Sequence, residues 1–287
     1  EMQNNTKGGD KWRLPNASLY YSHFSEGLIQ TSVQGDDSID QGLGVPDNTT
    51  EFFERYYGYM KYVGLDGVKI DEQAIAGVLR PRPATRNAND YRHRHQISLQ
   101  LMDAIANTVG KFQANDNTTP MIHCMSNAPE TMYRIPSLFP GRSLPLFRAS
   151  DDFMPNIPES HGTMIANLGF NSMLLGHLTT PDWDMFQTVL KDNQYTSGHV
   201  LAKFHAVARS ISGGPIYISD DPKITPNTTL LASMVCEDGT IIPCAGVGQP
   251  VRSSLLRDPF VGDKPLRIWN INGVLDGEVT SGVVGLF

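Results

Sequence analysis

The chain has 287 residues and a formal net charge of −7, and only 18% of its residues are charged. This length can form one barrel-sized domain or two smaller ones with a substantial core. The sequence contains no run of Lys and Arg that would indicate a nucleic-acid surface. It also lacks an uninterrupted apolar stretch of about 18 residues, which argues against a membrane-spanning helix. We therefore expect neither nucleic acid nor a membrane among its partners.

Five Asn-x-Ser/Thr sequons favour a secreted protein, because such tripeptides accept N-linked glycans on surface loops. They begin at Asn4, Asn16, Asn48, Asn117 and Asn227. The chain starts at Glu1 without an initiator Met or a signal peptide, so we expect a mature or excised segment. No Cys or His spacing suggests zinc, and we expect neither a metal nor a cofactor.

Predicted helices and strands alternate up to residue 220, after an irregular segment at 1–50 in which only 17–23 resembles a strand. Apolar spacing predicts helices over 51–63, 87–112, 161–171 and 198–212. Short apolar runs predict strands at 67–71, 120–125, 146–150, 172–178 and 215–219. Such alternation indicates a parallel sheet with helices outside it. About five barrel-type strands are present, whereas a closed barrel needs eight, so we expect a piece of a longer polypeptide.

The pattern changes after Asp220 to short strands separated by turn residues. The predicted strands lie at 230–235, 240–243, 266–271 and 283–287. We expect an antiparallel β domain here, with a boundary near 221–228.

An Asp238-Gly239 turn would join the first two of these strands as a hairpin. A two-residue turn would place Cys236 opposite Ile241 rather than opposite Cys244. A disulfide across the hairpin would then require a bulge, so we do not expect one.

Polar side chains follow the predicted strands at several places. In a β/α barrel, the carboxyl ends of the strands form the active site. The residues concerned are Lys69 and Asp71; Cys124, Ser126 and Asn127; Arg148, Ser150, Asp151 and Asp152; Asp182, Trp183 and Asp184; and Asp220 and Asp221.

Carboxylates at two of these places have a cation two to four residues upstream. Asp71 follows Lys69, and the acidic pair Asp151-Asp152 follows Arg148. Retaining glycoside hydrolysis needs one ionised carboxylate as nucleophile and a second that carries a proton to the leaving oxygen. The lysine would favour the anion of Asp71 by its charge, and a sugar-covered pocket would raise the pKa of the second carboxyl by desolvation. On the local pattern alone, a surface salt bridge between Lys69 and Asp71 explains the first pair almost equally well.

Four motifs in this order resemble the raffinose synthase and alkaline α-galactosidase family, a group of glycoside hydrolase family 36 in the α-galactosidase clan. The motifs are GVKID at 67–71, RASDDF at 148–153, PDWDMF at 181–186 and GGPIYISD at 213–220. The resemblance extends from about Gly42 to Phe287. It implies an α/β fold in which residues 1–220 form about strands four to eight of a (β/α)8 TIM barrel. Residues 221–287 would begin an antiparallel β-sandwich domain.

The resemblance also implies roles for the residues at the strand ends. Asp71 of the K-x-D motif would be the nucleophile on the fourth strand. Asp152 would be the acid/base after the sixth strand, because the R-x-x-x-D spacing selects it over its neighbour. The residues expected to bind substrate or border its pocket are Lys69, Cys124, Arg148, Asp151, Trp183 and Asp184. The family places further acidic residues, which bind the galactose O4 and O6 hydroxyls, on earlier strands that this chain lacks.

Three functions remain open. We predict a retaining α-galactosidase that cleaves terminal α-galactosyl groups from oligosaccharides. An α-galactosyltransferase of the raffinose synthase type is the first alternative, in which sucrose instead of water intercepts the Asp71 intermediate. A non-catalytic carbohydrate-binding or structural fragment is the second. The expected partners are an α-galactoside oligosaccharide and the N-terminal remainder of the polypeptide.

Several residues also have a simpler structural explanation. Trp183 would either stack on a sugar ring or belong to the core. His93 and His95 lie two apart in a predicted helix and therefore face different ways, so we interpret them as a solvated face rather than a metal pair. We interpret His123 as a packed strand residue. Asp220 and its neighbour Asp221 would contact substrate or cap the following turn. The helix at 198–212 has core spacing at Val200, Leu201, Phe204, Val207, Ala208 and Ile211 and needs no functional explanation.

Overall fold

The structure is a computed structural model that describes most of the chain after residue 48. The described residues are 21–22, 49–71, 73–74, 79–80, 94–112, 119–141, 143–190, 198–241, 243–275 and 277–287. Most of the irregular segment at 1–50, the start of the predicted helix at 87–112, and the sequons other than Asn227 lie outside them. Among the described residues, no helix is both long and apolar enough to cross a membrane.

The chain divides into two compact units, which we describe separately. The first comprises Glu1–Val68, Glu72–Asp116 and Asn127–Arg134. The second comprises Lys69–Asp71, Asn117–Ser126 and Ile135–Phe287.

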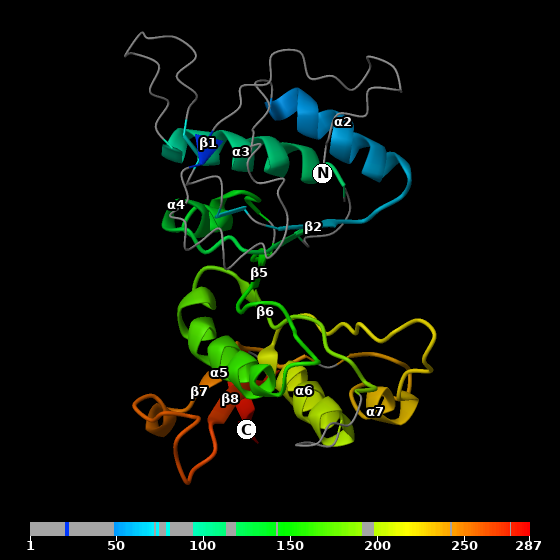
Figure 1. Ribbon diagram of the computed structural model, residues 1–287, viewed down its shortest axis with the longest axis vertical. Helices are drawn as coiled ribbons and strands as arrows, with labels where there is room; N and C mark the ends of the chain where they lie inside the picture. The colour runs from blue at the N-terminus through cyan, green and yellow to red at the C-terminus, as the bar shows by residue number, and fades with distance from the viewer. Residues whose placement is uncertain are drawn as a thin grey trace. The chain divides into compact units, whose positions relative to one another are not determined.

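Two helices, α2 (Thr49–Tyr62) and α3 (Arg94–Val109), pack against each other in the first unit (Figure 1). The buried face of α2 presents Phe53 and Tyr57, four residues apart, with ring centroids 5.5 Å from each other. Tyr57 also meets the ring of Phe112 edge-on at 6.4 Å. Aromatic residues spaced by four form one stripe of a helix, so the predicted helix is confirmed by the face it buries.

The remaining elements of the first unit are short. β1 (Tyr21–Ser22) pairs with β3 (Leu79–Arg80) in antiparallel orientation. α4 (Pro129–Met132) begins with a proline, which fits the first turn of a helix because it lacks an N–H that would go unpaired there.

A parallel four-stranded sheet in the order β2-β4-β5-β6 forms the centre of the second unit. Its strands are β2 (Val68–Ile70), β4 (Met121–His123), β5 (Leu146–Arg148) and β6 (Thr180–Asp182). Three of them confirm the strands predicted at 67–71, 120–125 and 146–150. The helices α5 (Pro158–Leu175) and α6 (Gly198–Ser212) lie side by side in this unit (Figure 1).

A separate antiparallel sheet has the order β7-β8-β9 and follows later in the chain. It consists of β7 (Gln249–Pro250), β8 (Arg267–Leu275) and β9 (Glu278–Leu286). The last two confirm the strands predicted at 266–271 and 283–287 and extend them. The α/β expectation is thus confirmed in outline by the parallel sheet and the separate three-stranded antiparallel sheet.

Side chains of β8 attach this sheet to the two long helices. Ile268 is fully buried, and a Cβ added to Gly169 of α5 would lie 3.0 Å from its Cδ1 atom. The amide of Asn270 donates to the backbone oxygen of Ile211 in α6 at 2.7 Å. The glycine therefore permits close approach of the helix, and the amide satisfies a carbonyl at the helix end.

Two predicted strands are helical in the structure. The apolar run 172–178 continues α5 to Leu175, and the strand comes only at β6. The run 230–235 begins instead inside α7 (Thr228–Ala232). Here Asn227 is the N-cap, and its Oδ1 accepts from the backbone N–H of Leu230 at 3.0 Å. A cap that satisfies an amide of the first turn favours the helix over a strand.

Two further predictions need smaller corrections. The run 215–219 forms a single parallel bridge, Phe186↔Ile218, rather than a ladder. The hairpin predicted around Asp238-Gly239 has three loop residues, 237–239, instead of two. Val235 pairs with Ile241, so the next pair inward is Cys236 with residue 240. The backbone N–H of Cys236 donates to the carbonyl oxygen of residue 240.

Candidate active site

The carboxyl ends of the parallel strands bring most of the predicted site residues to one edge of the sheet. Arg148, the last residue of β5, is in register with Asp182, the last residue of β6. The backbone N–H of Cys124, just after β4, donates to the oxygen of Ile70 at 2.9 Å, which joins β4 to the end of β2. Side chains that follow parallel strands therefore converge here, as the sequence predicts.

At the β2 end, the buried thiol of Cys124 is hydrogen-bonded to the side chain of Asp71. Burial and the neighbouring carboxylate raise the pKa of this thiol to about 11, although the charges of Arg148 and Lys69 oppose the rise. The thiol is thus protonated near neutral pH and donates to the carboxylate. Asp71 and Lys69 are themselves exposed. Four predicted site residues consequently lie within electrostatic reach of one another.

Arg148 is the centre of the second half of the site. Its buried guanidinium contacts Asp152 through Nη1 at 3.1 Å, Asp182 through Nε at 3.4 Å and Asp184 through Nη2 at 2.5 Å. The side chains of the last two are fully buried, whereas that of Asp152 is 67% exposed. Burial alone would lower the pKa of Arg148, but the charges of the buried carboxylates outweigh it and raise the pKa above its ordinary value. Two buried anions thus fix the cation that reaches the exposed carboxylate.

Tyr217 completes this group, and it was not predicted as a site residue. Its hydroxyl lies 3.0 Å and 2.8 Å from the two carboxylate oxygens of Asp182. Burial and the charge of Asp182 raise the pKa of the Tyr217 phenol above its ordinary value, so it stays a donor. Asp182 also accepts the backbone N–H of Asp184 at 2.9 Å. Its buried charge is therefore satisfied by three donors, counting Arg148.

The glycine pair of the GGPIYISD motif explains how Tyr217 reaches this position. Gly213 has φ of 77°, and an added Cβ would lie 1.8 Å from the backbone oxygen of Gly246. A Cβ on Gly214 would lie 2.3 Å from the oxygen of Pro181. Only residues without a side chain allow this segment to pass so close to β6. The double glycine was the signal in the sequence from which this approach was predictable.

Asp184 has a left-handed backbone, with φ of 62°. Its carboxylate accepts the N–H of Phe153 at 2.8 Å and that of Met185 at 2.7 Å, besides its contact with Arg148. Burial raises the pKa of Asp184, while Arg148 and the two amides oppose the rise. Aspartate tolerates this conformation better than most residues because its short side chain hydrogen-bonds nearby backbone. Asp184 is thus part of the buried scaffold behind Asp152 and is closed off from solvent.

The structure separates Asp151 and Trp183 from the group around Arg148. Asp151 is exposed, and its backbone oxygen accepts the hydroxyl of Ser150 at 2.8 Å. Trp183 is fully buried, and its indole N–H donates to the hydroxyl of Ser172 at 3.0 Å. A fully buried ring offers no face to a sugar, so the structure favours the core interpretation of this tryptophan.

The other polar residues singled out in the sequence have packing or capping roles in the structure. His123 is fully buried in β4, and burial lowers its pKa to about 3, which fits a packed residue. Asp220 accepts from the backbone and hydroxyl of Thr188, and Asp221 accepts the N–H of Lys223 in the following turn. Both acidic residues therefore cap loops. His93 and the side chain of His95 lie outside the described residues.

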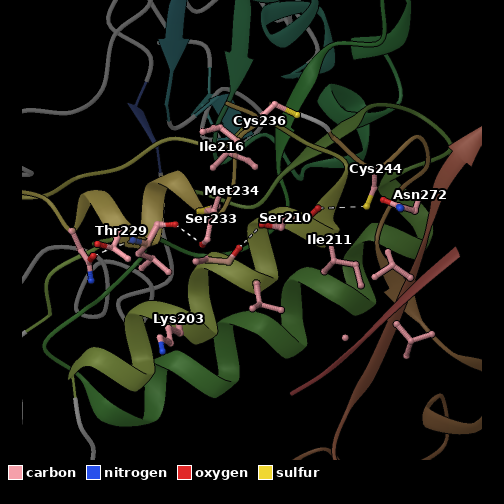
Figure 2. Close-up of a pocket in the computed structure, with 18 residues that line it drawn as sticks. Lys203, Ser210, Ile211, Ile216, Thr229, Ser233, Met234, Cys236, Cys244 and Asn272 are labelled. Carbon is pink, nitrogen blue, oxygen red and sulfur yellow. Dashed lines mark hydrogen bonds between the residues drawn. The ribbon is translucent and has the colours of Figure 1, made fainter. Parts of the chain in front are cut away.

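A cavity of about 1080 Å³ lies elsewhere in the second unit, along α6 (Figure 2). Lys203, Ser210 and Ile211 of α6 line it, together with Cys236 and Cys244. No Asp or Glu belongs to this lining among the described residues. Glycosyl transfer through a carboxylate pair therefore has no means of occurring in this cavity.

Comparison with known proteins identifies related sequences over almost the whole chain. The family model described as raffinose synthase or seed imbibition protein Sip1 matches residues 7–287. Probable galactinol–sucrose galactosyltransferase 6 of Arabidopsis thaliana is 33% identical over 274 residues, which cover 94% of this chain and 32% of that protein. Galactinol–sucrose galactosyltransferase of Pisum sativum is 30% identical over 288 residues, with coverage of 96% and 32%. Stachyose synthase of Pisum sativum is 29% identical over 257 residues, with coverage of 86% and 26%. The chain spans about a third of the length of the curated relatives it matches.

Proposed function

The chain belongs to the family of raffinose synthase and seed imbibition protein Sip1, and from this membership we propose that the whole protein transfers α-galactosyl groups with retention. The observation that carries the proposal is the pair of exposed carboxylates at one edge of the parallel sheet. Asp71 is held by the thiol of Cys124, and Asp152 is held by Arg148. A double displacement needs two such groups, one as nucleophile and one as acid/base.

In the first step, Asp71 attacks the anomeric carbon of an α-galactoside. A bond forms between that carbon and a carboxylate oxygen as the glycosidic C–O bond breaks, and Asp152 gives its proton to the leaving oxygen. Lys69 lies in β2, two residues before Asp71. Arg148 contacts the carboxylate of Asp152 through Nη1 at 3.1 Å and so holds it in position for this transfer.

In the second step, the Asp152 carboxylate takes a proton from an acceptor hydroxyl. The acceptor oxygen attacks the anomeric carbon, and the bond to Asp71 breaks. Water as acceptor gives hydrolysis, and a sugar hydroxyl gives transfer. The relatives named as galactinol–sucrose galactosyltransferases favour transfer, from galactinol to sucrose. We therefore propose transfer in place of the hydrolysis predicted as the leading function.

We also propose that the parallel sheet is part of a (β/α)8 barrel. β2, β4, β5 and β6 would be strands four to seven, and the segment 215–219, bridged in parallel to Phe186, would be the eighth. Residues 221–287 would begin a β-sandwich domain. The remaining strands would come from the rest of the longer polypeptide, so we propose the activity for the whole protein and not for these 287 residues alone.

The test is a product analysis of the full-length protein with galactinol as donor, with and without sucrose. We expect a galactosylated sucrose as the main product and little free galactose when sucrose is present. Galactose release that sucrose does not suppress would favour the hydrolase. No turnover with either acceptor would contradict both the transferase and the hydrolase. The matched control is the Asp71→Asn variant, which isolates chemistry at the proposed site from contaminating activity.

Secretion, expected from the five sequons, is a further proposal about the whole protein. Of these asparagines the structure describes Asn227, whose side-chain oxygen caps α7. Treatment of the protein from its native source with an endoglycosidase tests the proposal. A drop in apparent mass is the expected result, and an unchanged mass would contradict glycosylation.

A further inference from the structure

A row of three hydrogen-bonded side chains lies behind the loop that carries Asp152. Arg209 and His205, one turn apart on α6, are both fully buried, and His161 on α5 is almost fully buried. Nη1 of Arg209 is 2.6 Å from Nδ1 of His205, and Nε2 of His205 is 2.6 Å from Nδ1 of His161. Nε2 of His161 is 3.2 Å from the backbone oxygen of Pro155. The proposed reaction uses none of these side chains directly.

The direction of the hydrogen bonds in this row follows from its first member. A guanidinium has only donors, so Nδ1 of His205 must accept and its Nε2 must carry the proton. His161 then accepts at Nδ1 and donates from Nε2 to the carbonyl oxygen of Pro155. Burial and the charge of Arg209 lower the pKa of His205 to about 2, and burial lowers that of His161. Both rings are therefore neutral at physiological pH, with one donor and one acceptor each.

One end of the row fixes the loop at residues 184–185. Nε of Arg209 donates to the backbone oxygen of Asp184 at 3.1 Å, and Nη2 donates to that of Met185 at 2.9 Å. This is the turn in which Asp184 has a positive φ. A left-handed aspartate is held best where surrounding donors fix its backbone.

The other end fixes the residues that follow Asp152. The ring of Phe153 meets His205 edge-on at 4.9 Å and His161 at 5.9 Å, with the guanidinium of Arg209 5.9 Å from its centroid. Its backbone N–H donates to the carboxylate of Asp184. The loop is thus fixed at Phe153 by the ring contact and the backbone amide. It is fixed at Pro155 by the hydrogen bond from His161.

We infer that Arg209, His205 and His161 form a positioning relay for the acid/base. The relay joins the loop of Asp184 to the loop of Asp152 and so keeps the exposed carboxylate within reach of Arg148. The inference rests on the proposed function, because it assigns the positioned group as the proton donor. A proton donor displaced by even an ångström loses much of its effect, since proton transfer requires hydrogen-bond distance to the leaving oxygen.

The test compares two amide variants of His161, one long and one short, in the full-length protein. His161→Gln places an N–H donor near the position of Nε2, from where it reaches the oxygen of Pro155. His161→Asn is too short to do so. Both variants lose the imidazole, so a difference between them reports the hydrogen bond to the loop and not the presence of a ring.

The readout is the ratio of kcat/KM for an aryl α-galactoside to kcat/KM for an alkyl-type donor such as galactinol. A nitrophenolate leaves without protonation, whereas an alkoxide needs the acid, so a displaced Asp152 slows the alkyl donor selectively. We expect His161→Asn to raise the ratio by about tenfold, which is part of the 10²–10⁴-fold that a fully positioned general acid contributes. His161→Gln should restore it to within about threefold of wild type. A merely structural role would lower both donors in the same proportion.

Each result separates the inference from the proposed function. Wild type that turns over neither donor contradicts the function. If wild type is active and the two His161 variants have the same ratio of aryl to alkyl kcat/KM as each other, the relay is overturned. If His161→Asn is recovered only unfolded, Phe153→Leu tests the same contact from the loop side, because it keeps an apolar side chain and removes the ring. A raised ratio supports the relay, and an unchanged ratio overturns it.

Discussion

The two carboxylates proposed to carry the reaction are both exposed but are supported in different ways. Behind Asp152 lies a buried ionic scaffold, in which Arg148 is fixed by Asp182 and Asp184. Asp71 follows β2, the strand at the edge of the described sheet. Its described contacts there include the thiol of Cys124. Changes on the acid/base side should therefore cost stability as well as activity, whereas changes at Asp71 should cost activity.

The largest effect on activity is expected at Asp71. In the whole enzyme, Asp71→Asn should lower kcat by roughly 10⁴-fold or more, because an amide cannot form the covalent intermediate. The free energy of unfolding should change by no more than about 0.5 kcal/mol, since the side chain is exposed. Steady-state kinetics and urea unfolding measure the two effects.

Two further results would bear on this assignment. Exposed Asp66, outside the site, provides the control, and Asp66→Asn should leave kcat unchanged. A slowly turning-over fluorinated galactosyl donor should leave its sugar on Asp71, and its recovery on any other carboxylate by mass spectrometry would contradict the choice of nucleophile.

The largest effect on stability is expected at Arg148. Arg148→Met leaves Asp182 and Asp184 buried without their cation, which should lower the free energy of unfolding by about 3–5 kcal/mol. Arg148→Lys keeps the positive charge but cannot contact three carboxylates at once. Its free energy of unfolding should lie between those of Arg148→Met and wild type. Exposed Arg257→Met should change it by less than about 0.5 kcal/mol. Equal losses in all three variants would remove the distinction between the two halves of the site.

The sequence predicted the long helices and three of the four parallel strands, but it placed a strand in two apolar runs that are helical. The runs that became β2, β4 and β5 are short, apolar and followed by polar residues, so their local pattern agrees with the fold. The run at 230–235 is equally apolar, but the N-cap at Asn227 precedes it and a helix forms. An asparagine before an apolar run is a helix-start signal in the sequence, but the apolar content of the run favoured a strand.

The site was predicted where chemistry follows directly from strand ends, and missed where it depends on contacts between distant segments. Lys69, Asp71, Cys124 and Arg148 converge as expected. Tyr217 meets the group around Arg148 only because a glycine pair passes close to β6. Hydrophobic periodicity contains no information about such an approach, which only the glycine pair itself indicates.

Helix α6 shows the same limit most clearly. Its predicted core positions include Val200 and Val207, which are exposed. Its buried face instead contains Ala202, His205 and Arg209. A pattern that scores only apolar residues cannot find a face whose polar groups are paired inside the protein.

On the nucleophile side, the support from Cys124 should be visible in the pH dependence of stability. The ordinary thiol pKa is about 9, and it rises to about 11 in the folded protein. Between these values the unfolded thiol ionises while the folded thiol stays protonated, so the free energy of unfolding falls as pH rises. Wild type should therefore lose about 2–3 kcal/mol more than Cys124→Ala between pH 8 and 11. The exposed Cys236→Ala variant should follow wild type, and parallel curves for all three proteins would contradict a buried, protonated thiol at Asp71.

The smallest effect is expected at Tyr217, on the acid/base side. Tyr217→Phe removes one donor from Asp182, which keeps Arg148 and the backbone N–H of Asp184, so the free energy of unfolding should fall by about 1 kcal/mol. Exposed Tyr59→Phe is the control and should have no effect. In Arg148→Met, however, Asp182 depends more heavily on the phenol, and adding Tyr217→Phe should then cost more than it does in wild type. A double-mutant cycle by urea unfolding measures this coupling. Additive losses would mean that the two donors act independently, and the scaffold behind Asp152 would then be a set of separate contacts rather than one cooperative ionic network.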